Sequence, residues 1–144
     1  MKKRYIFFLV PVSLFISFHA AHGAVTISEI MYDPDGSDTN REWVEVYNDG
    51  ASSVDLTGYK FVEAETNHGL TSYSGGTSLG AGEYSIIALD AATFAAEYTT
   101  SGPVFDASFS LINSGGETLS LKDGGGNIVF TVTYNPTLGG NDDG

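Results

Sequence analysis

The sequence predicts an all-β domain, either a sandwich or a barrel, with one short helix. Runs rich in Val, Ile, Thr, Tyr and Phe recur about every ten residues and are separated by Gly, Asn, Asp and Ser, a rhythm typical of these folds. The last third of the chain alternates apolar and polar side chains, as antiparallel strands with one solvated face do. A helical pattern occurs in the mature chain only after Asp90.

Residues 1–23 have the features of a secretory signal peptide, and we leave them out of the fold. Lys2 to Arg4 supply the positive charge, and Tyr5 to Phe18 is a largely apolar run. That run is shorter than the roughly 18 apolar residues of a membrane-spanning helix. Small residues in Ala21-His22-Gly23 predict cleavage before Ala24. We therefore expect a secreted protein, extracellular, on the cell surface or periplasmic; an uncleaved anchor is the alternative.

The mature chain is predicted to form one domain over residues 24–135, followed by a tail over 136–144. The tail is rich in Gly, Asn and Asp and has no strand pattern, so it is a flexible end or the stub of a truncated linker. The sequence contains no Cys. An exported domain without disulfides must be stabilised by packed apolar side chains or by bound ions.

The charge of the mature chain is strongly negative. All eighteen acidic residues follow Gly23, whereas only Arg41, Lys60 and Lys122 remain of the six basic ones, which leaves a net charge of −15. Binding to DNA or RNA depends on Lys and Arg replacing counterions on phosphates. We therefore expect no binding to nucleic acid. The negative surface is expected to attract cations instead.

The first predicted strands are Val25–Tyr32 and Trp43–Asn48. In the second strand Val44 and Val46 lie on one face, and the opposite face carries Trp43, Glu45 and Tyr47. The next expected elements, in order, are a strand Val54–Val62 bent at Gly58, a weak strand Thr66–Tyr73, a break at Ser74–Thr77, a turn at Leu79–Glu83 and an apolar strand Tyr84–Leu89.

Asp90 is the expected N-cap of a short helix over Ala91–Tyr98. Phe94 and Tyr98, four residues apart, share its inner face. Beyond the helix, Leu119 and Leu121 point to one side of a strand, and Asp123 to Asn127 forms a hairpin turn. In the final strand one face carries Ile128, Phe130, Val132 and Tyr134.

Several motifs in this order resemble those of the lamin-tail domain family. They are Ile27-x-Glu29-Ile30, then Glu42-Trp43-Val44-Glu45-Val46-Tyr47-Asn48, then Asp55-Leu56-Thr57-Gly58-Tyr59, then Leu79-x-x-Gly82-x-Tyr84, and finally Phe109 to Asp123. The resemblance extends from Val25 to Tyr134. It implies an immunoglobulin-like antiparallel β-sandwich, and the family supplies no catalytic residues to transfer.

The resemblance implies a module that binds or scaffolds. In animal lamins this domain ends a coiled-coil filament protein and docks partners, but no heptad pattern is present here from which filament assembly could be inferred. Bacterial relatives are exported and often accompany hydrolases or nucleases in one polypeptide. We therefore expect a secreted, non-catalytic module that contacts a protein or an extracellular or cell-surface polymer. The alternative is an accessory N-terminal domain of a truncated exported hydrolase or nuclease. The oligomeric state is not predicted.

The loop from Asp33 to Asn40 is the strongest candidate ligand site. Asp33, Asp35 and Asp38 are oxygen ligands of the kind that Ca²⁺ prefers. Their spacing departs from an EF-hand, and Val44 stands where its bidentate Glu would be. The alternative is a solvated turn with side chains that bond their own backbone. We assign no metal ligand and no cofactor.

Other candidates are interpreted as structural. Glu29, Glu42 and Glu45 could pass for a catalytic carboxylate pair, but rim carboxylates bonded to backbone or to Arg41 are commoner. His68 is the one His of the mature chain and is expected to be a solvated loop residue. The aromatic side chains are expected mainly in the core, with Trp43 as its anchor. The Gly-rich stretches 75–76 and 124–126 are expected to be turns. We therefore predict no catalytic residues.

Overall fold

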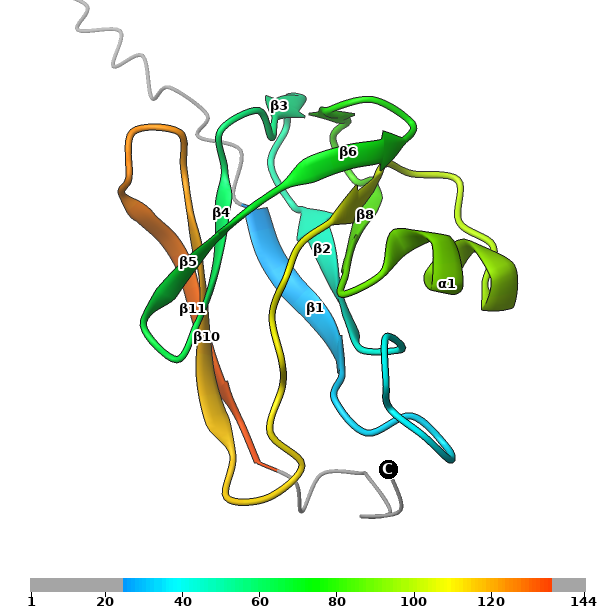
Figure 1. The fold of residues 1–144 in the computed structure, drawn as a ribbon. Helices are drawn as coiled ribbons and strands as arrows, with labels where there is room; N and C mark the ends of the chain where they lie inside the picture. Colours follow the sequence, from blue (N-terminus) through cyan, green and yellow to red (C-terminus); the bar gives the residue numbers. More distant parts are fainter. Residues whose placement is uncertain (1–24, 136–144) are drawn as a thin grey trace, which may run out of the picture.

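Two β-sheets face one another, and a short helix covers the outer face of one of them (Figure 1). The structure is a computed structural model that describes residues 25–135. The predicted signal peptide, its cleavage site before Ala24 and the tail 136–144 lie outside the described residues. The predicted fold class, an all-β antiparallel sandwich with one short helix, is confirmed.

The first sheet has five strands in the order β1-β2-β8-β9-β6. They are β1 (Val25–Met31), β2 (Trp43–Asn48), β8 (Tyr84–Ala88), β9 (Val104–Asp106) and β6 (Thr71–Ser74). The pairs are antiparallel except for β8 and β9, which are parallel. Parallel neighbours need a crossover connection, and α1 (Ala91–Glu97) supplies it between β8 and β9.

The second sheet has four antiparallel strands in the order β11-β10-β4-β5. They are β11 (Ile128–Tyr134), β10 (Glu117–Lys122), β4 (Lys60–Glu63) and β5 (Thr66–Gly69). A separate two-stranded sheet pairs β3 (Val54–Asp55) with β7 (Ser78–Leu79).

Two predicted strands are divided between sheets. The run Val54–Val62 changes direction at Gly58, whose φ is +78°, so β3 and β4 belong to different sheets. The run Thr66–Tyr73 passes from β5 in the second sheet to β6 in the first (Figure 1). The segment 66–74 therefore joins the two sheets at the side where β5 and β6 are the outer strands.

The strand β9 has no counterpart among the predicted elements. It is three residues long, which is too short for an alternating pattern. Its place is set by pairing with β8, where Ile86 lies opposite Val104 and Ala88 opposite Asp106. Tertiary contacts, not local sequence, make this segment a strand.

The main core lies between the two sheets. Its largest fully buried side chains include Phe61, Phe105 and Ile87. Val44 and Val46, predicted to share one face of their strand, both point into it. Trp43 is buried, but in a second cluster between the first sheet and α1. This follows from alternation along β2, because a side chain next to Val44 must face the other way. Trp43 therefore anchors the helix and not the sandwich interior.

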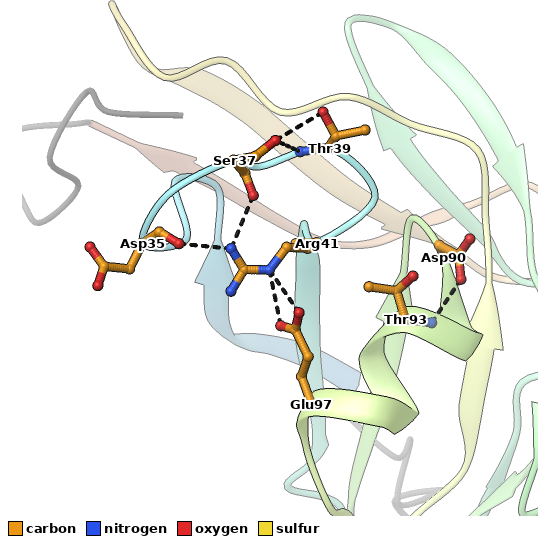
Figure 2. A network of polar contacts seen from close by, with 7 residues as sticks. All are labelled: Asp35, Ser37, Thr39, Arg41, Asp90, Thr93 and Glu97. Carbon is orange, nitrogen blue, oxygen red and sulfur yellow. Dashed lines mark hydrogen bonds and ion pairs between the residues drawn. The ribbon is translucent and has the colours of Figure 1, made fainter.

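The helix begins as predicted and ends one residue early. Asp90 Oδ1 accepts a hydrogen bond from the Thr93 N–H at 2.8 Å (Figure 2), which caps the first turn. Phe94 is buried, and Tyr98 stacks on it with ring centroids 5.1 Å apart. Tyr98 itself is 37% exposed, so it covers the edge of the Trp43 cluster. No helix among residues 25–135 is long and apolar enough to cross a membrane.

The last hairpin follows the predicted alternation with one irregularity. Leu119 and Leu121 are buried, and Asp123 accepts backbone N–H groups across the turn, as expected. The register shifts between Leu121 and Lys122, so Lys122 lies opposite Ile128. Ile128 is consequently 62% exposed, which leaves an apolar side chain at the start of β11 in solvent.

Candidate functional site

Arg41 organises the Asp33–Asn40 loop. Its Nη1 donates to the carbonyl oxygens of Asp35 at 2.7 Å and of Ser37 at 3.0 Å. Its Nε donates to both carboxylate oxygens of Glu97, at 2.9 and 3.0 Å (Figure 2). One guanidinium thus ties the loop to the last turn of α1. Arg41 does not bond to any of the three rim Glu residues considered from the sequence.

Two of the loop carboxylates already accept a hydrogen bond. Asn113 Nδ2 donates to Asp38 Oδ2 at 2.9 Å and to Asp33 Oδ1 at 3.4 Å. Within residues 25–135, no group of three or more His, Asp or Glu side chains is placed where it could hold a metal ion. Asp33 and Asp38 therefore share a protein partner in Asn113, and a melting experiment tests the calcium alternative.

Calcium is expected to leave the thermal stability unchanged. A ligand that binds the native state raises apparent stability by mass action, and no preformed set of three or more carboxylates occurs in the part of the chain that the structure describes. Melting curves in millimolar CaCl₂ and in EDTA should therefore superimpose within about 1 °C, whereas a site exposed to calcium at about a hundred times its Kd would add about 2.7 kcal/mol. A rise of several degrees in calcium alone would establish the site.

Replacement of Arg41 by Gln is expected to loosen the loop with a small effect on global stability. Half-exposed ion pairs contribute about 0.2–1 kcal/mol, and both partners here are partly exposed. We expect urea unfolding to show a loss of about 1 kcal/mol or less, while amide exchange accelerates at residues 35–41. Lys122→Gln, which removes a surface cation bonded to Asn67, should leave exchange in the loop unchanged. Equal loop protection in both variants would contradict the role of Arg41.

A cluster of carboxyl groups lies at one end of the sandwich interior. Glu42 is 4% exposed, and its Oε2 accepts the Leu111 N–H at 3.0 Å. Burial raises its pKa to about 7, the hydrogen bond from Leu111 opposes this, and the charges of Asp38, Glu117 and Glu63 raise it further. Glu42 bonds to backbone, as expected of a structural carboxylate, but it is a buried group and not a rim group.

Glu117 and Tyr134 are the second part of this cluster. The Tyr134 hydroxyl donates to the Ile112 carbonyl at 2.8 Å and lies 3.2 Å from Glu117 Oε2. Burial, followed by the charge of Glu63, raises the pKa of Glu117. Burial and the nearby Glu117 carboxylate raise the pKa of the Tyr134 phenol far above its ordinary range.

The prediction that His68 is a solvated loop residue is wrong. His68 lies in β5 opposite Phe61, and its side chain is 11% exposed. The ring contacts Phe61, with centroids 6.3 Å apart, and Nε2 lies 3.1 Å from Glu63 Oε2. The Asn67-His68-Gly69 sequence suggests a loop, but pairing with β4 turns it into a strand that places the imidazole inward.

Sequence reasoning missed Glu63 and Glu117 as members of this cluster, and Asn113 as the partner of the loop carboxylates. Strand alternation could have indicated both residues. Glu117 lies on the same face of β10 as the buried Leu119 and Leu121, and Glu63 lies on the same face of β4 as Phe61. A carboxylate at an inward position of a strand indicates either a buried pair or a ligand. Which groups meet there depends on the pairing of distant segments.

Glu29 and Glu45 lie apart from this cluster and opposite each other on β1 and β2. Glu45 Oε1 accepts from Ser28 Oγ at 2.9 Å, and Glu29 is exposed. Like charges directly opposite on adjacent strands repel. The three Glu residues considered from the sequence therefore do not form one acid–base site.

An open groove lies between β1 and β11, the edge strands of the two sheets. Its volume is about 370 Å³. The lining comes from Ile27 to Asp33 on one side and from Val132, Tyr134 and Asn135 on the other. Tyr32 and Tyr134 stack beside it with ring centroids 4.9 Å apart.

The aromatic residues divide between interior and surface. Tyr32, Trp43 and Phe61 are buried, as expected, whereas Tyr73 and Tyr84 are about half exposed. Tyr84 contacts Tyr47 with ring centroids 4.6 Å apart. The stretches 75–76 and 124–126 are turns, as predicted, and positive φ angles occur at Gly75, Gly76 and Gly126.

Comparison with known proteins agrees with this architecture. The family model described as Lamin Tail Domain matches residues 19–136, which includes all the strands of both sheets. A search of curated proteins gives no significant match. The matched range covers most of the chain and includes every motif on which the resemblance rested. The chain therefore belongs to the lamin tail domain family.

Proposed function

We propose that this chain is a secreted, non-catalytic binding or scaffolding module that contacts a protein or a cell-surface polymer. Membership of an immunoglobulin-like family supports a module without turnover of its own. The buried carboxyl groups support the same role, because Glu42 is bonded to the Leu111 backbone and Glu117 to Tyr134.

One observation carries the binding role. The two longest strands, β1 and β11, are both sheet edges, and an open groove lies between them. Such edges expose backbone donors and acceptors in fixed positions on a rigid scaffold. Outer strands with a groove beside them present a surface suited to a partner.

A binding screen tests this role directly. Purified chain is applied to arrays of glycans, matrix polymers and extracellular proteins, and is also incubated with chromogenic hydrolase and nuclease substrates. We expect at least one saturable ligand and no turnover. Turnover that disappears on changing a single carboxylate would contradict the proposal, and so would the absence of any ligand.

Secretion has its own test. The full chain is expressed with residues 1–23 intact, and the N-terminus of the material recovered outside the cytoplasm is sequenced. We expect it to begin at Ala24. Material that retains Met1, or that stays in the cytoplasm, would contradict the expected secretion.

A further inference from the structure

We propose that residues 107–113, which lead from β9 to β10, form a pH-gated strap. The strap is shut over one end of the sandwich while the buried carboxyl groups that hold it keep a proton, and it opens locally as they ionise. This motion needs no partner, so it is independent of the proposed binding role. Three features support it: an unpaired backbone, anchors made by carboxyl groups, and like charges around those groups.

The backbone of the strap is extended but unpaired. Ala107, Phe109 and Leu111 are buried, whereas the residues between them are exposed, which is the alternation of a strand. Residues 108–113 nevertheless belong to no strand, and they make no backbone-to-backbone hydrogen bond within residues 25–135. Figure 1 shows this segment in yellow, leading from the first sheet to the second. Segments with few backbone bonds open at low cost, so the strap can move while both sheets stay intact.

Two residues of the strap are held by carboxyl groups. The Leu111 N–H donates to Glu42 Oε2 at 3.0 Å, and Asn113 Nδ2 donates to Asp38 Oδ2 at 2.9 Å. Glu42 immediately precedes β2, and Asp38 lies in the loop before it. Because Glu42 is 4% exposed and bonds to the strap backbone, opening of the strap would admit water to its carboxyl group.

The residue between these two is held by a phenol. The Tyr134 hydroxyl donates to the Ile112 carbonyl at 2.8 Å and lies 3.2 Å from Glu117 Oε2. Tyr134 ends β11 and Glu117 begins β10, so this anchor comes from the second sheet. Residues 111–113 are thus tied to the sandwich through side chains, and each of these side chains is a carboxyl group or lies beside one.

The charges around Glu42 are mostly negative. Burial is the main cause that raises the pKa of Glu42, to about 7, and the charges of Asp38, Glu117 and Glu63 raise it further. Arg41, the preceding residue, is turned away toward the loop and α1. The other titratable groups of the cluster and its anchors are Asp33 of the loop before β2, His68 of β5, which bonds to Glu63, and Tyr134 of β11.

Ionisation of Glu42 therefore favours the open strap. When the strap is open the carboxyl group meets water and titrates near its ordinary value of 4.5, whereas under the closed strap its pKa is about 7. Between these values the closed state keeps a proton that the open state has lost, so each pH unit favours opening about tenfold and the whole range about 300-fold. Packing opposes opening, because Phe109 contacts Phe61 with ring centroids 4.9 Å apart. The strap is therefore shut in acid and opens more often near neutral pH.

Amide hydrogen exchange of the full chain, followed by nuclear magnetic resonance from pH 4.5 to 7.5, tests the strap. The protection factor of the Leu111 N–H, which corrects for the intrinsic effect of pH on exchange, should fall about tenfold per pH unit up to about pH 7. Low concentrations of urea should not accelerate this exchange, because a local opening exposes little surface. Amides at the centre of β10 should exchange by global unfolding, which urea accelerates.

Two variants separate the gate from the anchors. Glu42→Gln removes the titrating group but keeps an oxygen to accept the Leu111 N–H. Protection of Leu111 should then change less than about tenfold over the same pH range, with the raised pKa of Glu117 as the remaining source. Tyr134→Phe removes the anchor on Ile112 and should lower the protection of Leu111 about fivefold at every pH, with the steep pH dependence retained.

Glu65→Gln is the matched control, because it removes one carboxylate at an exposed position in the turn between β4 and β5. It should keep the exchange profile of the natural chain. Constant protection of Leu111 across the pH range would overturn the strap. Acceleration of its exchange by urea as strong as at the centre of β10 would also overturn it, and so would equal pH dependence in Glu42→Gln and Glu65→Gln.

Discussion

Replacement of Asn48 by Ala is expected to lower the free energy of unfolding by about 3 kcal/mol. Asn48 is fully buried at the end of β2. Its Nδ2 lies 2.9 Å from the Ser52 carbonyl, 3.0 Å from that of Leu79 and 3.1 Å from that of Gly80. Its Oδ1 accepts the Gly50 N–H at 3.0 Å. Truncation would leave several of these buried groups without a partner, and each such group costs about 1–3 kcal/mol.

Urea denaturation at constant pH measures this loss, and a melt should show a fall of roughly 10 °C for a domain of this size. Asn67→Ala is the matched control, because Asn67 is exposed and accepts one bond from Lys122. It should cost less than about 0.5 kcal/mol. If Asn48→Ala is as mild as the control, the bonds of Asn48 do not hold the β2 and β7 ends together.

Asn48 also explains one part of the family motif. It closes the Glu42 to Asn48 segment, and its backbone N–H and carbonyl bond to Glu83 and Gly82. A single amide side chain thus connects the turn after β2 with the turn before β8. The resemblance identified this Asn as part of a pattern, and the structure shows its physical use.

The second large effect is a loss of stability as the pH rises from about 4.5 to about 7. The Glu42 carboxyl titrates at 4.5 when unperturbed, and in the folded protein its pKa is about 7. Between these values the folded state retains a proton that the unfolded state has lost, so the free energy of unfolding falls with pH. The difference amounts to about 3 kcal/mol, and it is constant above the upper pKa.

Other titratable groups also contribute to the pH dependence of stability. Glu117 has a raised pKa and therefore adds to the loss as pH rises. Asp55 and Asp123 have pKa values below 3.8 in the folded state, because they accept hydrogen bonds in turns. Their contribution is present above that value and is lost as the pH falls through their folded pKa. Among these groups, maximum stability is therefore expected near pH 4 to 4.5, above the Asp value of 3.8 and below the onset of the Glu42 loss at 4.5.

Glu42→Gln tests the assignment of this effect. Gln retains an oxygen to accept the Leu111 N–H but carries no charge to bury. At pH 7.5 the variant should be about 3 kcal/mol more stable than the natural chain, and near pH 4.5 the two should be nearly equal. Urea denaturation at four pH values measures how the free energy of unfolding of each protein changes with pH.

Glu65→Gln is the matched control, because it removes the same charge at an exposed site. Its free energy of unfolding should change with pH as steeply as that of the natural chain. If the free energy of unfolding of Glu42→Gln also changes as steeply, the pH dependence belongs to another group, such as Glu117. The two variants together separate the burial of one carboxyl from the general repulsion among the acidic side chains.

Much of the fold was predictable because the relevant signals are local. The alternation of Leu119 and Leu121 with polar neighbours, the separation of Val44 from Trp43 on β2, and the N-cap Asp90 each depend on residues close in sequence. The resemblance to the lamin-tail family then selected a sandwich over a barrel. The expected strand breaks at Gly58 and at Gly75-Gly76 also follow from local conformation, since all three glycines have positive φ angles.

The candidate sites were harder to predict for the opposite reason. The sequence presented Glu29, Glu42 and Glu45 as neighbours, yet Glu42 lies with Glu63 and Glu117 from other strands. It presented His68 as a loop residue, yet β5 pairs with β4 and turns the ring inward. These groupings depend on contacts between segments many residues apart, which no local pattern records.

The sequence by itself determined most of the strands, where the helix starts, the excess of negative charge and the family resemblance. Tertiary structure decided that Val104–Asp106 is a strand parallel to β8 and that residues 66–74 serve both sheets. It also decided that β1 and β11, the outer strands of the two sheets, lie beside one groove. The physical reason is that side-chain periodicity specifies how a segment folds and which face it buries, whereas strand order is set by which distant segments pair.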